Sequence, residues 1–323
     1  MTTLWDTSGT QVVKALAVER RHSGAVSSGL ALTLVSVVDE ALVAEAEQAA
    51  TAAAAQHPCR LLLVVRHRVD APAPRLDAEV SVGGRLGPGE VVVMRMYGRL
   101  ALHAESVVLP LLAADAPVVT WWYGPPPDRI ATDPLGVLAD RRITDCRTAA
   151  DPLAALRTRA EDYAPGDTDL AWTRTTLWRG LCASAFDSLT GEVESLRVSG
   201  EASNPSRALL AGWLTARLGI GVTLEDTSGP GVTGVELGVG GTSVSLTRTD
   251  GRTAVVRRPG QPDRSLPLPR RELSDLLAED LRRLDADDTY AEALQEATGT
   301  SGLPERPKQR VHEWRDPAET GAP

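Results

Sequence analysis

The chain has 323 residues, of which 42% are hydrophobic and 24% charged, so it can bury a normal globular core, and its length favours two domains. The formal net charge of -9 disfavours binding to nucleic acids and anionic membranes, which would repel an acidic surface. The sequence starts without a basic segment followed by an apolar run, and no stretch reaches the roughly 18 apolar residues that cross a bilayer. We therefore expect a soluble, cytoplasmic protein that binds neither nucleic acid nor membrane.

In the first half of the chain, predicted strands alternate with predicted helices. Ser8 and Gln11 have capping-box spacing at the start of a helix. The runs at 30–38 and 60–66 are nearly continuously apolar, as strands inside a covered sheet are. The further elements expected are an alanine-rich helix from Asp39 to about His57, hairpin strands 76–82 and 91–96 around the glycine-rich turn 83–89, a helix 103–112, and strands 117–123 and 141–145. This order predicts an α/β N-terminal domain with a largely parallel or mixed sheet.

The second half begins after the Ala-Pro-Gly-Asp segment 164–167, which is the best candidate for a domain boundary. The elements expected are a long helix 170–189, a strand 193–198, a helix capped by Asn204, short strands with glycine-rich turns from 221 to 268, and a helical stretch 272–297. They predict a smaller α+β domain with an antiparallel sheet. The predicted division is therefore 1–165 for the N-terminal domain, 166–298 for the second domain and 299–323 for a disordered tail rich in Gly, Pro and charge.

The usual sequence motifs of catalysis and cofactor binding are absent or occur in the wrong structural context. The hexapeptide 229–234 has the G-x-G-x-x-G spacing of a dinucleotide site, but a strand-like run follows it where that site needs a helix. Neither lysine follows a glycine, which excludes a P-loop, and the zinc-protease and nucleophile-elbow motifs are missing. Cys59, Cys146 and Cys182 are too far apart for a zinc site and are expected to be buried apolar residues. We therefore expect no cofactor, no metal and no catalytic residues, in a protein that is not an enzyme.

Three stretches combine rare Trp, Pro and Gly at fixed spacings: 117–127 (PVVTWWYGPPP), 133–145 (DPLGVLADRRITD) and 163–174 (YAPGDTDLAWTR), the last continuing to Trp178 and Arg179. Through these stretches, and over nearly the whole chain to about residue 297, the sequence resembles the glucose-6-phosphate dehydrogenase assembly protein family (OpcA). The resemblance implies an N-terminal α/β assembly domain, a C-terminal domain of the same family, and a cytoplasmic protein that works by binding glucose-6-phosphate dehydrogenase.

Three of the few aromatic residues, Trp121, Trp122 and Tyr123, adjoin at the end of a predicted strand. Ligands and partners of open α/β sheets meet the carboxyl ends of the strands, and Trp, Tyr and Arg are enriched at interface hot spots. Because successive strand residues point to opposite faces, we expect one tryptophan to pack in the core and the other to be available to a partner. The alternative is that alternate members, such as Trp121 and Tyr123, simply fill the core.

Three arginines and a third tryptophan complete the candidate partner-binding set. Arg141 and Arg142 lie at a helix-to-strand junction, where they form either structural ion pairs or a bidentate site for a partner carboxylate or a phosphate. Trp172 and Arg174 flank the apolar stripe of the long helix and are candidates to face a partner.

The leading hypothesis is a non-catalytic partner of glucose-6-phosphate dehydrogenase that acts as an allosteric activator. It would promote the active assembly or conformation by binding that state more tightly, and so support the oxidative pentose phosphate pathway. The alternative is a sugar-phosphate-binding enzyme or sensor whose own small ligand is held by Arg141 and Arg142.

Overall fold

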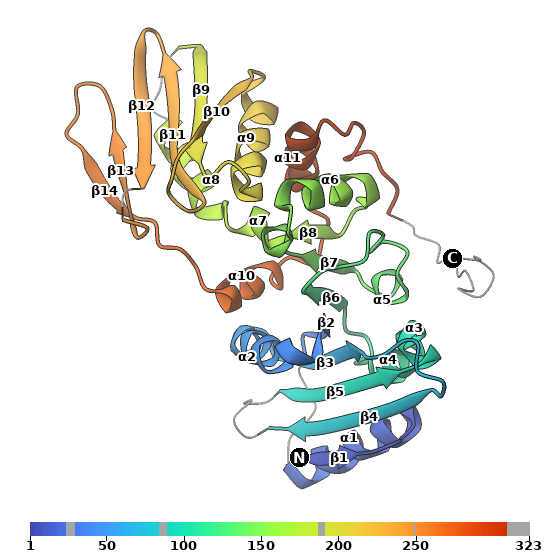
Figure 1. The fold of residues 1–323 in the computed structure, drawn as a ribbon. Helices are drawn as coiled ribbons and strands as arrows, with labels where there is room; N and C mark the ends of the chain where they lie inside the picture. The colour runs from blue at the N-terminus through green and yellow to red at the C-terminus, as the bar shows by residue number, and fades with distance from the viewer. Residues whose placement is uncertain (24–29, 84–88, 187–190, 249, 309–323) are drawn as a thin grey trace. The chain divides into compact units, whose positions relative to one another are not determined.

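The computed structural model describes residues 1–23, 30–83, 89–186, 191–248 and 250–308 (Figure 1). The chain divides into two compact units, Met1–Arg142 and Ile143–Arg306, of which the second is the longer. The predicted boundary at 165/166 stays a prediction about domains, because the division into compact units follows contacts alone. The glycine-rich turn expected at 84–88 lies outside the described residues. None of the helices in the described residues is long and apolar enough to span a membrane.

The first unit is built on a mixed sheet. Its strands are β1 (Thr2–Leu4), β2 (Leu32–Val38), β3 (Cys59–Arg66), β4 (Arg75–Val82), β5 (Glu90–Tyr97) and β6 (Val118–Tyr123). These six are hydrogen-bonded in the order β1-β4-β5-β3-β2-β6. The strands β5, β3, β2 and β6 run parallel to one another, whereas β1 pairs with β4 and β4 with β5 in antiparallel fashion. This confirms the predicted α/β domain with a largely parallel or mixed sheet.

The helices and 3-10 turns of the first unit range from three to 15 residues in length. They are α1 (Gly9–Ser23), the 3-10 turn η1 (Glu40–Leu42), α2 (Val43–Ala54), α3 (Arg99–Leu102), α4 (Ala104–Val108), the 3-10 turn η3 (Leu109–Leu111) and α5 (Pro134–Val137). The predicted capping box is present, because the Ser8 amide donates to Gln11 Oε1 at 3.1 Å and the Gln11 amide to Ser8 Oγ at 3.4 Å. The single helix expected at 103–112 is divided into α4 and η3, with Pro110 at the division.

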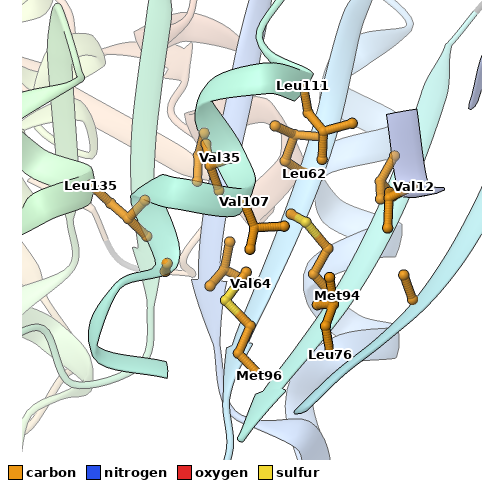
Figure 2. Packing of buried hydrophobic residues seen from close by; sticks show 14 of the residues in the cluster. Val12, Val35, Leu62, Val64, Leu76, Met94, Met96, Val107, Leu111 and Leu135 are labelled. Atoms are coloured by element: carbon orange, nitrogen blue, oxygen red, sulfur yellow. The ribbon is translucent and has the colours of Figure 1, made fainter. Parts of the chain in front are cut away.

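Both faces of the parallel strands are covered. Leu62 and Val64 of β3 point to one face, where they join α1, α4 and η3 residues in one apolar cluster. In Figure 2 the side chains of Val107 and Leu111 point from the helical segment toward this face. Residues 61, 63 and 65 alternate to the other face and are equally buried. Helix α2 packs on β2 and β3 through buried alanines that are not part of this cluster, which places it over that second face.

A buried ion cluster joins α1 to the sheet. Glu90, the first residue of β5, is 3% exposed and accepts hydrogen bonds from Arg20 Nη2 at 2.8 Å and Arg60 Nε at 2.7 Å. Arg60 also donates to the carbonyl oxygen of Leu111 in η3. Burial alone would raise the pKa of Glu90, but the hydrogen bonds from Arg20 and Arg60 outweigh it, so the pKa lies below its ordinary value. The charge on Glu90 therefore stabilises the fold.

The second unit combines a mainly antiparallel sheet with helices. β7 (Arg141–Thr144) spans the division between the units. The helices are η4 (Cys146–Thr148), α6 (Pro152–Asp162), α7 (Leu170–Thr173), α8 (Thr176–Phe186), α9 (Pro205–Leu218), α10 (Leu273–Asp280) and α11 (Asp288–Thr298). The strands are β8 (Asp167–Asp169), β9 (Val193–Gly200), β10 (Val222–Asp226), β11 (Val232–Val239), β12 (Thr242–Arg248), β13 (Thr253–Arg257) and β14 (Arg264–Pro267). The last six form a sheet in the order β10-β9-β11-β12-β13-β14, in which β10 and β9 alone are parallel.

Two predicted long helices are interrupted. The helix expected at 170–189 is split into α7 and α8, and residues 187–189 lie outside the described residues. At the split, Thr175 Oγ1 donates to the Trp172 carbonyl oxygen at 2.7 Å, a local bond that competes with helix continuation. The stretch expected at 272–297 is split into α10 and α11, because Asp287 starts a new helix by accepting from the Tyr290 amide at 3.0 Å.

The segment after α11 packs on the second unit, although its composition predicts disorder from Gly299 onward. Leu303 is fully buried, and Arg306 Nη1 donates to the carbonyl oxygens of Ala160 and Tyr163 at 3.0 and 2.8 Å. Composition, dominated here by Gly, Pro and charge, does not reveal that one leucine and one arginine anchor the segment. Residues 309–323 of the predicted tail lie outside the described residues.

All three cysteines are buried free thiols, and burial raises the pKa of Cys59 and of Cys182 to about 12. We expect none of them to react with a thiol-specific reagent at neutral pH in the native state, because the thiolate is the reactive form. In denaturant all three should titrate. The measurement is a time course of thiol modification with and without urea. Rapid native-state reaction of any cysteine would contradict this expectation.

Candidate functional site

The order of the parallel strands reverses between β2 and β6. From β2 the chain crosses through α2 to β3 on one side, and it later returns as β6 on the other side of β2. Ligands of open α/β sheets bind at such switch points, outside the carboxyl ends of the strands. A cavity of about 230 Å³ lies at these ends and is called here the strand-end groove. Its lining residues are Val37, Val38, Asp39, Arg66, Trp122, Tyr123, Gly124, Pro125 and Pro127.

One arginine side chain, that of Arg66, lines the strand-end groove, and a single carboxylate holds it in place. Arg66, the last residue of β3, donates from Nη1 and Nη2 to the two oxygens of Asp133 at 2.9 and 3.0 Å. Asp133 Oδ1 also accepts from the Leu135 amide at 2.9 Å and so caps α5, as the Asp-Pro pattern predicts. The bidentate pair therefore links the end of β3 to the start of α5. It also fixes the orientation of the guanidinium in the groove wall.

A close backbone approach fixes the loop between β6 and α5. A Cβ atom on Gly136 would lie 1.7 Å from the carbonyl oxygen of Ile130, so only glycine fits there. The same Cβ position is 3.5 Å from the Trp122 ring. Ile130 and Gly136 thereby hold the loop against Trp122. The position of the groove wall thus depends on a residue that does not line the groove.

The three aromatic residues predicted at the end of β6 are placed unequally. Trp121 is 0% and Trp122 2% exposed, so both tryptophans of the pair are buried. Trp122 also contributes to the strand-end groove, together with the half-buried Tyr123. The Tyr123 ring lies 5.0 Å from the Trp121 ring, centroid to centroid. Tyr123 is therefore the more accessible of the three, and the binding role of all three stays a prediction.

Arg141 and Arg142 are only 2% and 3% exposed. Arg142 Nη1 donates to the carbonyl oxygens of Ala139 and Gly136 at 2.8 and 3.2 Å, at the C-terminal end of α5. A cation in this place satisfies carbonyls that the last helical turn leaves unpaired. Both arginines are thus embedded in the fold in this structure, and their proposed contact with a carboxylate or phosphate stays untested.

Trp172 and Arg174 lie in the second unit and make structural contacts there. Trp172 is 2% exposed, donates from Nε1 to Asp287 at 2.9 Å, and is covered by the Arg179 guanidinium 3.6 Å from its ring centroid. Burial lowers the pKa of Arg179 to about 10. Arg174 forms a bidentate pair with Asp145 at 2.7 and 2.6 Å. Of the seven predicted residues, the structure brings Trp122 and Tyr123 together in one cavity.

Comparison with known families decides what the chain is related to. Residues 50–161 match the family model for the N-terminal domain of the glucose-6-phosphate dehydrogenase subunit, OpcA. Residues 165–294 match the family model for the C-terminal domain of that same subunit. The chain belongs to the OpcA family. The two matches leave only 162–164 between them, so the family likeness covers both halves of the chain.

A curated relative in the OpcA family is the putative OxPP cycle protein OpcA of Synechocystis sp. It is 28% identical to this chain over 142 residues, which cover 40% of this chain and 29% of the relative. The match therefore spans less than a third of the relative's length. The name itself places that protein with the oxidative pentose phosphate cycle.

Three solved structures resemble this OpcA-family chain weakly. They are the NADP-bound 3-ketoreductase KijD10 of Actinomadura kijaniata (12% identity, TM-score 0.45), an oxidoreductase of Sinorhizobium meliloti (12%, 0.44) and a levoglucosan dehydrogenase bound to NADH and L-sorbose (10%, 0.43). Each alignment covers 84% of this chain and 96% of the other. All three are oxidoreductases, which contradicts the sequence-based prediction that this chain is not an enzyme. At these identities and TM-scores the likeness assigns no activity either.

Sequence reasoning missed Arg66 and Asp133 as members of the candidate site of this OpcA-family protein. The signal for Arg66 was available, because it ends a predicted parallel strand just as Tyr123 does. The signal for its partner was partial: the Asp-Pro pattern identifies Asp133 as a helix cap, but its second role depends on a contact 67 positions away in sequence. No group of three or more His, Cys, Asp or Glu side chains that could hold a metal occurs among the described residues.

Proposed function

We propose that this chain binds glucose-6-phosphate dehydrogenase and promotes its active assembly or conformation, in support of the oxidative pentose phosphate pathway. The single observation that carries the proposal is the match of both halves of the chain to domains named for a subunit of that dehydrogenase. The curated relative, named for the oxidative pentose phosphate cycle, agrees with it. The proposal includes a cytoplasmic location, because the chain would have to encounter the dehydrogenase there.

The strand-end groove is the surface that we assign to the dehydrogenase. It combines two aromatic side chains, prolines and a guanidinium held in a fixed orientation, and aromatic and arginine side chains are enriched at protein interfaces. Binding there can activate the enzyme only if the active state is bound more tightly than the inactive one. A difference of about 1.4 kcal/mol in binding free energy shifts that equilibrium tenfold.

The test is a binding and kinetic titration of the dehydrogenase with the full chain. We expect the two proteins to co-elute in gel filtration, and the activity or substrate affinity of the dehydrogenase to change. The chain alone is assayed in parallel with glucose 6-phosphate and NADP, so that an activity of its own is not mistaken for activation. Separate elution at micromolar concentrations, together with unchanged kinetics, would refute the proposal.

Replacement of Tyr123 by alanine tests the groove itself. We expect the dissociation constant to rise by about 30-fold, since truncating an interface anchor costs about 2 kcal/mol or more. Trp5→Ala is the matched control, because Trp5 is 69% exposed in the same unit and lies outside the groove. Melting curves of both variants must show an intact fold. Normal binding by a folded Tyr123→Ala variant would remove the groove from the interface and leave the partnership to be located elsewhere.

A further inference from the structure

A second cavity, within the second unit, is lined by an unusual set of charges. It has a volume of about 70 Å³ and lies between the start of α9, the start of β11, the end of β12 and the segment before α10. Five arginines and no carboxylate are among its lining residues, and it is called here the arginine pocket. The arginines are Arg147, Arg174, Arg248, Arg270 and Arg271.

Two of these five charges are neutralised within the protein. Arg174 pairs with Asp145, and Arg271 pairs with Glu279. The other three have no carboxylate partner among the described residues. Arg248 donates to the Val232 carbonyl oxygen at 2.7 Å, Arg270 donates to the Pro230 carbonyl oxygen at 2.9 Å, and Arg147 is exposed. These carbonyl contacts position the guanidiniums without cancelling their charge.

The surroundings of Arg248 show the resulting excess of positive charge. Its guanidinium lies 5.2 Å from the ring centroid of Trp178, and its Nε is buried without a hydrogen-bond partner among the described residues. Burial, and then the neighbouring charge of Arg270, lower the pKa of Arg248 to about 10. A bound anion would relieve both effects.

A buried hydroxyl independently points to a ligand at this site. Ser206, in the first turn of α9, is 5% exposed and lines the arginine pocket, yet its Oγ has no hydrogen-bond partner in the described part of the chain. Buried hydroxyls are normally satisfied, and leaving one unpaired is costly. The Asn204 side chain already accepts from the Ser206 and Arg207 amides, so Oγ is the group left over. The positive end of the α9 dipole adds to the attraction for an anion.

One carboxylate lies close by without closing the pocket. Glu201 Oε2 accepts from the Gly231 amide and from Asn204 Nδ2, each at 3.2 Å. Those hydrogen bonds, with the charge of Arg147, lower the pKa of Glu201. Glu201 is not a lining residue of the pocket. One negative charge against three unneutralised arginines still leaves a net positive site.

We propose that the arginine pocket binds the phosphate group of a small phosphorylated ligand. A phosphate dianion offers several acceptor oxygens to Arg147, Arg248 and Arg270, and guanidiniums suit it because they donate in a planar fork. The Ser206 hydroxyl supplies a further donor. Residues 229–231, whose glycines suggest a phosphate loop only superficially, contribute Pro230 and Gly231 to the wall beside β11 instead of preceding a helix. This site is independent of the proposed partnership and needs no dehydrogenase.

The test is a calorimetric titration of the full chain with inorganic phosphate as the probe, at constant ionic strength, with chloride and acetate as parallel arms. We expect phosphate to bind more tightly than either monoanion. In the double variant Arg147→Gln/Arg270→Gln, the affinity should fall at least tenfold. Both side chains are exposed, so the fold should survive. Arg264→Gln, an exposed arginine of the same unit outside the pocket, should bind normally.

Ser206→Ala separates the pocket from general attraction to positive charge. It leaves every arginine in place and should weaken phosphate binding severalfold with an unchanged melting curve. The proposal is overturned if phosphate shows no preference over chloride and acetate, or if the double variant binds as tightly as the wild type. Full phosphate affinity in Ser206→Ala also counts against it. These measurements are made without the dehydrogenase, so they succeed or fail separately from the proposed partnership.

Discussion

Alanine in place of Trp121 or Trp122 is expected to lower the free energy of unfolding by about 3–5 kcal/mol in each case, since both side chains are almost completely buried. The two residues point to opposite faces of β6, so each substitution opens a cavity in a different layer. Equilibrium denaturation in urea measures the loss. Losses of this size in both variants would contradict the sequence-based expectation that one tryptophan packs in the core and the other is available to a partner.

Two controls make this prediction specific. Trp5→Ala, at a tryptophan that is 69% exposed, should change stability by no more than about 0.5 kcal/mol. Phenylalanine at 121 or 122 should cost far less than alanine, because neither indole nitrogen has a hydrogen-bond partner to lose among the described residues. Wild-type stability in Trp122→Ala would contradict the burial of Trp122 described above.

Glu90→Gln is expected to destabilise the first unit by about 3–5 kcal/mol, the usual cost of removing one partner from a buried ion cluster. The substitution keeps the shape of the side chain but leaves Arg20 and Arg60 without their shared carboxylate. Glu40→Gln is the matched control. Its carboxylate also pairs with an arginine, Arg95, but is 44% exposed, so its loss should cost about 1 kcal/mol or less.

The pH dependence of stability supplies a second readout for Glu90. The folded-state pKa of Glu90 lies below the ordinary value of 4.5. Its contribution is therefore fully present above pH 4.5 and is lost as the pH falls through the lower, folded-state pKa. The wild type should lose this part of its stability in acid, whereas Glu90→Gln should lack it at every pH. Parallel pH profiles for the two proteins would contradict this assignment.

Local signals predicted much of the fold. The capping box at Ser8 and the caps at Asp133 and Asn204 are present as expected, because each depends on residues a few positions apart. The apolar runs of β2 and β3 predicted covered parallel strands for the same reason. The splits of the two long helices were missed, since they depend on a threonine hydroxyl and an aspartate cap that helical periodicity does not register.

The candidate sites were less predictable than the elements. The rule that ligands meet the carboxyl ends of strands led to Tyr123, but the burial of Trp121 and Arg141 depends on tertiary packing that the local sequence does not show. The arginine pocket was not foreseen. Arg147, Arg248 and Arg270 are separated by long stretches of sequence, and an unpaired arginine looks the same as a paired one until its neighbours are known.

The contact between Gly136 and Ile130 bears on how mutational data for this protein should be interpreted. Any side chain at 136 would push the 124–133 loop away from β6, because it would meet a backbone carbonyl that cannot rotate aside. In a saturation scan scored on complex formation, position 136 would rank beside the contact residues while touching no partner. A map of the interface drawn from such a scan would then include a buried glycine whose role is to leave space for the Ile130 carbonyl oxygen.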